Sequence, residues 1–510
     1  MDSQPPADSF GAAPDAPTAW TPPGVAATGP GAASGPTAGY ATGPTVGYAA
    51  GPGAALGLGT VPGQAPLPAP PKRFDGKRVL WLSLLIAACA LCAIGVVAYI
   101  GFNIGAVALT VGIAAAMLPV PVLVGCFLWL DRYDPSPMWI FATCFVWGAG
   151  VATGGALLVN TGASNLFEGF GAPDDLVAVL VAPFIEELFK AAFPLLLFLF
   201  NRRAYSGIID GIVYCGITAT GFAMVENVLY LGGLGFASAS EEGGYAAGAF
   251  AVTGMFIGRV LLTGFAHPLF TSMTGIGLGI AARTPHRWVR FVAPLCGLLV
   301  AMMLHGAWNL MATLAANNPL VILYGYFAVF MPIFLGMLGL VLWVRSWEGR
   351  LAERVLPAYA AAGWFSPPEV AALGTLGRRL SARRWAKRVA GDAGHAAMRG
   401  YQFAATQLAL LRDAMNRGIR HGERNLAQAT AEEQRLLTTI DGYRRVFVGR
   451  DPFTPRAWWS DGGYQIQFPD GEVRAVAAPS LPVVPVPFLL TPVGAPPPAH
   501  QPWLPPLPSS

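Results

Sequence analysis

Charged residues are scarce in this 510-residue chain, because only 12% of its residues are Asp, Glu, Lys or Arg, whereas 54% are hydrophobic. Such a composition excludes a soluble globular protein of this size and predicts a membrane protein with several spans. The formal net charge is only +4. We therefore expect no nucleic acid among its partners.

Cysteine is also rare, and its placement is informative. All six cysteines lie within apolar stretches, without a paired spacing outside them that would suggest a metal site. They are expected to pack as small hydrophobic side chains and not to form a disulfide framework. The start of the chain lacks a basic segment followed by an apolar one, so no cleavable signal peptide is predicted.

Long apolar runs, in contrast, are abundant. A helix needs roughly 20 apolar residues to cross a bilayer. Arg or Lys stands at every second boundary between the apolar runs, and the alternate connections contain neither. By the positive-inside rule, we expect a multi-pass protein of a bacterial plasma membrane with both termini in the cytoplasm. The sequence predicts an all-α bundle of about eight spans, at residues 79–101, 104–130, 138–159, 176–200, 207–234, 250–282, 289–314 and 320–344.

The regions outside the spans differ in composition. Residues 1–71 are rich in Pro, Gly and Ala and are predicted to form a disordered cytoplasmic tail. After the membrane domain at 72–345, residues 346–450 show the apolar spacing of helices, and 451–478 have the pattern of a small β-hairpin. Residues 479–510 are Pro-rich, which predicts a disordered tail that a polyproline-reading partner would bind.

Three charges interrupt one of the apolar spans. Glu186, Glu187 and Lys190 lie near the middle of residues 176–200. An ionisable side chain near the bilayer centre costs about 2.5–3.5 kcal/mol on insertion scales, so it normally faces a protein interior or a water-filled cavity. We interpret this segment as the core of an active site.

Polar residues of three later spans are predicted to lie at a similar depth. They are Glu226, His267 and the pair His305 and Asn309. Residues four apart share a helical face, which applies both to His305 with Asn309 and to Glu186 with Lys190. The spacing therefore predicts one shared polar cavity. Pro268 directly after His267 predicts a kink in its span.

Four motifs on successive spans carry a resemblance to a known family. They are Glu186-Glu187-x-x-Lys190, Phe222-Ala-Met-Val-Glu226-Asn227, His267-Pro268 and His305-Gly-Ala-Trp-Asn309, and Asp131-Arg-Tyr-Asp-Pro135 looks like a further signature. The chain resembles the PrsW family of intramembrane proteases, which is related to CAAX-protease-like and APH-1-like membrane proteins. The resemblance implies hydrolysis of a peptide bond in a membrane-anchored, single-pass substrate, in bacteria often an anti-sigma factor. CAAX-type relatives carry histidine where this chain has Glu226.

The residue types suggest roles in hydrolysis. Two adjacent glutamates in a low dielectric do not both ionise cheaply, so we hypothesise that Glu186 is the base that activates water and Glu187 is its acid partner or orienter. Lys190 would then balance the negative charge. By analogy with CAAX-type relatives, His305 and Asn309 would stabilise the oxyanion. His267 and Glu226 would position water or shuttle protons.

Other interpretations of the same residues remain open at this point. Two histidines and several carboxylates also suit Zn²⁺, although the His-Glu-x-x-His pattern is absent. A proton-coupled transporter would use similar charges, but it often contains inverted repeats, and no clear repeat is present. A non-catalytic membrane scaffold is the third alternative. Arg259, on the sixth span, is expected to be a counter-charge or to extend toward the membrane surface.

Overall fold

The computed structural model describes residues 76–171, 173–361, 364–365, 367–419, 423–447, 456–460, 463–467, 472–477 and 489–491. The predicted N-terminal tail lies outside these residues, and so does most of the predicted Pro-rich C-terminal tail.

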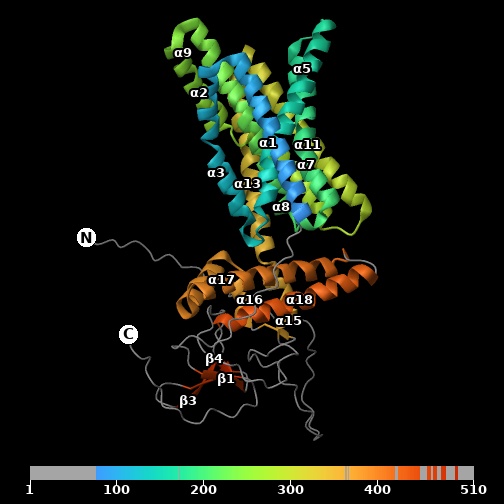
Figure 1. The fold of residues 1–510 in the computed structure, drawn as a ribbon, viewed down its shortest axis with the longest axis vertical. Coiled ribbons are helices and arrows are strands. Elements are labelled where there is room, and N and C mark those ends of the chain that lie inside the picture. Colours follow the sequence, from blue (N-terminus) through green and yellow to red (C-terminus); the bar gives the residue numbers. More distant parts are fainter. Residues whose placement is uncertain are drawn as a thin grey trace, which may run out of the picture. The chain divides into compact units, whose positions relative to one another are not determined.

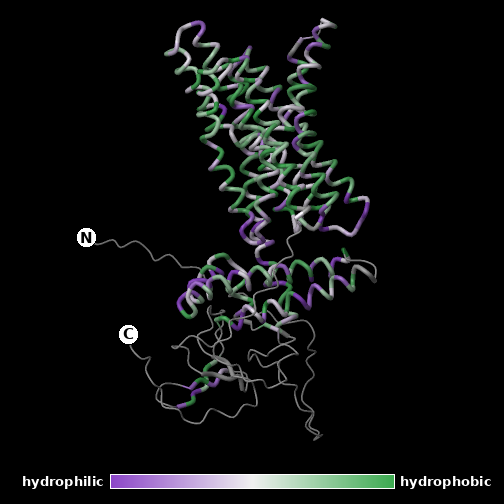
Figure 2. The backbone as a smooth tube through the Cα atoms, viewed as in Figure 1, coloured by the Kyte–Doolittle hydropathy of each residue, from purple (hydrophilic) through white to green (hydrophobic). Residues whose placement is uncertain are grey.

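Apolar helices form a bundle, as the hydropathy predicts (Figure 1). Figure 2 shows hydrophobic residues along most of the length of these helices. The helices are α1 (Gly76–Ile104), α2 (Ala106–Met117), α3 (Val120–Leu130), α4 (Met138–Val146), α5 (Thr153–Gly169), α6 (Asp174–Leu176), α7 (Ala182–Phe200), α8 (Ile208–Asn227), α9 (Ser238–Phe256), α10 (Ala266–Ala282), α11 (Arg287–Asn317), α12 (Leu320–Gly325) and α13 (Met331–Gly349).

The structure confirms the predicted helical membrane bundle, whereas the predicted number of about eight spans is only approximate. In the described part of the chain, six helical stretches are long and apolar enough to cross a membrane. One of them, Ile208–Ala282, contains two of the predicted spans. It reverses direction near Gly244, whose φ of 76° breaks the helix and suits a residue without a Cβ. The predicted span at 176–200 corresponds to a π-helical turn, Val177–Val181, followed by α7, and its three charges set α7 apart from the other spans.

Wider helical turns interrupt the bundle at five places. These π-helical segments are η2 (Trp147–Ala152), η3 (Val177–Val181), η5 (Val228–Ala237), η6 (Ile257–Leu262) and η7 (Tyr326–Phe330). The short 3₁₀ segments are η1 (Asp131–Tyr133) and η4 (Arg202–Ala204). Turns of the π type are rare and often accompany functional sites.

Helix α8 lies at the centre of the bundle, where it is buried along almost its whole length. Small residues permit this close packing, because a Cβ on Gly211 would collide with the backbone of Gly275 on α10, and a Cβ on Gly275 would collide with Gly211. Asp131 accepts hydrogen bonds from the backbone and hydroxyl of Ser136, which contacts the Tyr214 hydroxyl of α8 at 2.8 Å. The Asp131 motif thus organises the turn between α3 and α4.

The C-terminal region contains a second hydrophobic core, which includes Leu356, Phe365, Leu408 and Ile440. Its helices are α14 (Leu351–Val355), α15 (Pro357–Ala361), α16 (Pro367–Leu373), α17 (Leu376–Asn416) and α18 (Glu423–Phe447).

A four-stranded sheet of order β3-β2-β1-β4 follows these helices. Its strands are β1 (Arg456–Ser460), β2 (Gly463–Gln467), β3 (Val473–Ala477) and β4 (Leu489–Thr491). β2 pairs antiparallel with β3, from Gly463 opposite Ala477 to Gln467 opposite Val473. This pair coincides with the predicted hairpin. The sequence analysis did not predict β1 or β4.

Candidate active site

Helix α7 brings three charges together within one turn. Lys190 Nζ lies 3.2 Å from Glu186 Oε2 and 2.9 Å from Glu187 Oε1. The spacings of four and three residues place all three side chains on one helical face, which the sequence predicts for Glu186 and Lys190. The side chains of Glu187 and Lys190 are fully buried, whereas that of Glu186 is 11% exposed. Glu186 is therefore the least buried member of the group.

Glu187 is held by donors on both of its oxygens. Oε1 accepts from Lys190, and it lies 3.0 Å from His305 Nδ1 of α11. Oε2 accepts a hydrogen bond of 2.7 Å from the hydroxyl of Thr271 on α10. Three partners from three positions in the chain fix this carboxylate, which leaves it little freedom to take part in proton transfer.

The imidazole of His305 lies between the two glutamates of α7. Its Nδ1 faces Glu187, and its Nε2 lies 3.8 Å from Glu186 Oε2. Because a carboxylate only accepts hydrogen bonds, the contact with Glu187 favours the proton on Nδ1. The unprotonated Nε2 of a neutral ring then points toward Glu186.

His267 has the same arrangement with a different carboxylate. Its Nε2 lies 2.7 Å from Glu226 Oε2 of α8, and its Nδ1 lies 3.2 Å from Lys190 Nζ. The contact with Glu226 favours the proton on Nε2, so the Nδ1 lone pair points toward Lys190. The two imidazoles stand edge to face, with their centroids 5.1 Å apart.

The backbone explains how His267 reaches this position. The helical run is interrupted after η6, and α10 begins anew at Ala266. Pro268 therefore stands in the first turn of a helix, where its missing N–H costs no hydrogen bond. The predicted kink is thus a break between two helices, with His267 at the beginning of the second one.

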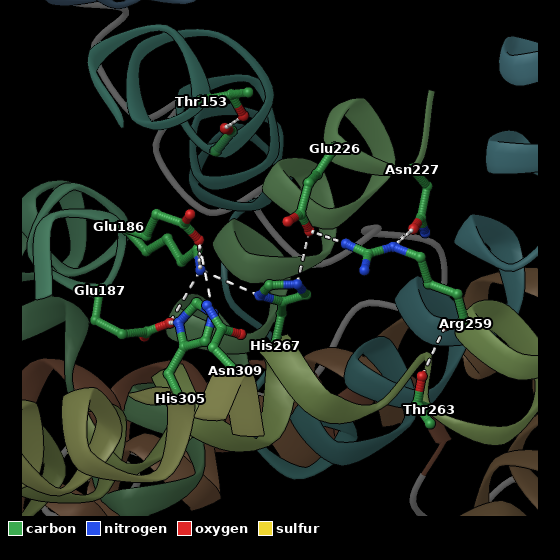
Figure 3. Close-up of polar contacts among 12 residues, drawn as sticks. Thr153, Glu186, Glu187, Glu226, Asn227, Arg259, Thr263, His267, His305 and Asn309 are labelled. Atoms are coloured by element: carbon green, nitrogen blue, oxygen red, sulfur yellow. Dashed lines mark hydrogen bonds and ion pairs between the residues drawn. The ribbon is translucent and has the colours of Figure 1, made fainter. Parts of the chain in front are cut away.

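The side chain of Asn309 bonds to the backbone of a neighbouring segment. Its amide donates a hydrogen bond of 2.8 Å to the backbone oxygen of Ala178 in η3. It thereby ties α11 to the π-helical turn that leads into α7. Figure 3 shows Asn309 beside His305, with Glu187 and His267 close by.

The predicted site residues of α7, α8, α10 and α11 therefore meet in one cluster. Arg259 of η6 adds a second cation beside Glu226, with Nη2 and Oε2 2.7 Å apart, so it is the counter-charge that the sequence suggested. Thr271, which donates to Glu187, was not predicted. Phe222, the first residue of the second motif, lies with its ring centroid 3.9 Å from Lys190 Nζ. The spacing could have revealed Thr271, because it lies four residues after His267 and hence on the same face of α10.

One set of side chains in this cluster suits a metal ion. Glu186, His267 and His305 each offer one ligand atom, and these atoms lie within 4.8 Å of one another. The second nitrogen of each imidazole faces a carboxylate, Glu226 or Glu187. Carboxylates commonly orient metal-binding histidines in this way. The donor set therefore fits a divalent cation such as Zn²⁺.

These features define a polytopic helical membrane protein with a buried carboxylate, imidazole and lysine centre. Residues 136–337 match the model of a family described as PrsW family intramembrane metalloprotease, and this range includes all seven predicted site residues. Residues 136–337 of the chain therefore form a PrsW-type protease domain, which confirms the resemblance that the four motifs carry.

Three relatives bear the name Protease PrsW. The protein of Geobacillus kaustophilus (strain HTA426) is 26% identical over 202 residues, which are 39% of this chain and 77% of the relative. That of Bacillus subtilis (strain 168) is 27% identical over 209 residues, or 40% of this chain and 84% of the relative. That of Clostridioides difficile (strain 630) is 34% identical over 118 residues, which are 22% of this chain and 48% of the relative. No solved structure matches the chain.

Proposed function

We propose that this protease hydrolyses a peptide bond of a single-pass, membrane-anchored protein by means of a water molecule that Glu186 activates. The observation that carries the proposal is the difference between the two glutamates of α7. Glu187 has donors on both oxygens, whereas Glu186 is partly exposed and faces the unprotonated side of His305. A base needs access to water, and Glu186 is the glutamate with that access.

The hydrolysis divides into two proton movements. Glu186 accepts a proton as the water oxygen bonds to the carbonyl carbon, and the negative charge develops on the carbonyl oxygen. The C–N bond then breaks, and the leaving amine takes a proton from the protonated Glu186. Lys190, 3.2 Å from Glu186, limits the accumulation of negative charge during the first step.

The remaining predicted residues act around this centre. His305 presents Nε2 on the side of Glu186. In the neutral ring this nitrogen accepts a hydrogen bond from the water, and only a ring protonated on both nitrogens would donate one to the developing oxyanion. Glu226 orients His267 through its Nε2. Asn309 supports the backbone of η3, so we assign the predicted oxyanion role to a His305 that is protonated on both nitrogens, and not to Asn309.

A metal ion would use the same residues. Glu186, His267 and His305 would hold it. When bound, such an ion polarises a carbonyl and makes a bound water more acidic. Lys190 lies within 3.2 Å of both Glu186 and His267, so its ammonium competes with a metal ion for those two donors. Glu186 stays essential with or without metal, because it is either the base or a ligand beside the attacking water.

We further propose the setting of the reaction. The distribution of arginine and lysine supports a bacterial plasma membrane with both termini in the cytoplasm. An anti-sigma factor is one substrate of the appropriate kind, because it is anchored by a single span. The polyproline-reading partner of residues 479–510 stays a prediction from the sequence.

Comparative membrane proteomics tests the proposal. Cells would express the wild type, Glu186→Ala, His305→Ala or, as a matched control, Glu241→Ala, which changes an exposed glutamate of α9. We expect a truncated single-pass protein in the wild type and the Glu241→Ala strain, and its loss in the other two. Identical fragments in all four strains would overturn the proposal and would favour a transporter or a scaffold.

A further inference from the structure

Arg259 belongs to none of the four motifs, yet three side chains hold its guanidinium group. Its Nε donates a hydrogen bond of 2.9 Å to Asn227 Oδ1, and its Nη2 lies 2.7 Å from Glu226 Oε2. Its Cζ lies 3.6 Å from the centroid of the Tyr230 ring. Figure 3 shows this guanidinium between Glu226 and Asn227.

The three partners come from one short segment of the chain. Glu226 and Asn227 end α8, and Tyr230 follows three residues later in η5. The backbone of Arg259 has a partner of its own. The Thr263 hydroxyl lies 3.1 Å from the backbone oxygens of both Gly258 and Arg259. The backbone and the side chain of Arg259 are thus fixed independently of each other.

This arrangement acts on the active site through Glu226. One oxygen of Glu226, Oε2, lies 2.7 Å from Arg259 and 2.7 Å from His267 Nε2. A rotation of the carboxylate away from His267 would therefore also break its contact with Arg259. The position of Glu226 in turn favours the proton on Nε2 of His267, which leaves the lone pair on Nδ1, 3.2 Å from Lys190 Nζ.

We propose that Arg259 is a positioning residue of this protease: it fixes Glu226, and Glu226 fixes the tautomer and orientation of His267. The proposal rests on the proposed function, since it assigns His267 to the centre around Glu186. Arginine suits the position because two of its three nitrogens, Nε and Nη2, reach Asn227 and Glu226 at the same time. A lysine has one nitrogen and reaches only one of them.

The structure offers a matched control for this proposal. Arg345 on α13 also stacks on an aromatic ring, with its Cζ 3.6 Å from the Trp129 centroid, and it donates to the backbone oxygen of Trp129. In the described residues, neither this guanidinium nor its ring contacts the cluster around Glu186. Arg345→Met therefore removes a comparable stacked cation and leaves the active site unchanged.

The first experiment measures Zn²⁺ binding to the full chain in lipid nanodiscs, by competition with a chromophoric chelator. Loss of the group that orients a metal-binding histidine weakens metal binding about 10–100-fold. We expect this effect for Arg259→Met, a smaller one for Arg259→Lys, and an affinity within about twofold of the wild type for Arg345→Met, since that variant leaves the orienting groups intact. Wild-type affinity in Arg259→Met would overturn the proposal.

The second experiment does not depend on a metal. Solid-state NMR of the ¹⁵N-histidine-labelled chain with chelator present reports which nitrogen of His267 carries the proton, and His267→Gln assigns the signal. We expect a protonated Nε2 in the wild type and in Arg345→Met, and a mixture of tautomers in Arg259→Met. An unchanged His267 signal in Arg259→Met would overturn the proposal.

The two experiments separate this proposal from the function on which it rests. A wild type that binds no Zn²⁺ but shows the expected change in the His267 signal would refute only the metal part of the proposed function. If Arg259→Met binds Zn²⁺ as tightly as the wild type and shows the same His267 signal, the positioning role is refuted and the proposed function stays intact.

Discussion

The cluster contains two pairs of a carboxylate and an imidazole, and the two pairs are stabilised in different ways. In the pair Glu187 and His305, the side chains are 0% and 3% exposed, and neighbours occupy both carboxylate oxygens. In the pair Glu226 and His267, both side chains are 16% exposed, and the cation Arg259 stands beside the carboxylate. Both carboxylates have a cation beside them, Lys190 in the first pair and Arg259 in the second. The first pair differs in its nearly complete burial and in the additional hydrogen bond from Thr271.

This difference indicates a division of labour. A fully buried charge must be paired, so the first pair contributes to the stability of the bundle. The second pair is partly solvated, so losing it costs less stability, and its main effect falls on the orientation of His267. Variants of the two pairs should therefore separate stability from catalysis.

The largest effect on stability is expected for Glu187→Ala. This change leaves Lys190 with one carboxylate instead of two and removes a partner from His305 and from Thr271. Breaking a buried ion pair costs about 3–5 kcal/mol. The free energy of unfolding in mixed micelles, titrated with SDS, should fall by that amount. Glu226→Ala serves as the comparison, and its free energy of unfolding should fall clearly less. Equal losses would contradict the division between the two pairs.

A smaller effect on the free energy of unfolding is expected when Zn²⁺ binds to the variant Lys190→Met. Lys190→Met removes the cation that lies within 3.2 Å of Glu186 and His267, so Zn²⁺ should bind more tightly than to the wild type. A ligand at 100 times its dissociation constant stabilises the folded state by about 2.7 kcal/mol. The unfolding free energy of Lys190→Met should rise by about this amount between chelator and saturating Zn²⁺. Weaker Zn²⁺ binding than in the wild type would show that Lys190 supports metal binding instead.

The smallest effect is expected for Asn309→Ala. Its amide donates one hydrogen bond to Ala178, and a neutral hydrogen bond contributes about 0.5–1.5 kcal/mol. Stability should fall by this amount, and the fragments detected by proteomics should persist at a reduced level. A variant with wild-type stability and no fragments would restore the oxyanion role that the family resemblance implies.

Much of this site follows from the sequence alone. Charged residues in an apolar span identify α7, and helical spacing places Glu186 and Lys190 on one face. Similar depths in the bilayer then bring in Glu226, His267 and His305. These inferences need only the length of a span and the period of a helix.

The details within the cluster could not be predicted in this way. Which nitrogen of His305 faces Glu187, and which oxygen of Glu226 meets Arg259, depends on the rotation of each helix about its axis. The break before His267 depends on η6, and a π-helical turn has no simple sequence pattern. The direction of Asn309 follows from the position of Ala178, a residue of another helix. Each of these features is a tertiary contact and has no local signal.

The most direct test of the central claim is cleavage by the purified full chain in proteoliposomes that contain the substrate found by proteomics, carried out in ¹⁸O-labelled water. The account predicts ¹⁸O in the new C-terminal carboxylate with the wild type. With Glu186→Gln, the rate should fall by about 10²–10⁴-fold, the usual contribution of a general base. Cleavage by Glu186→Gln at the wild-type rate would contradict the account.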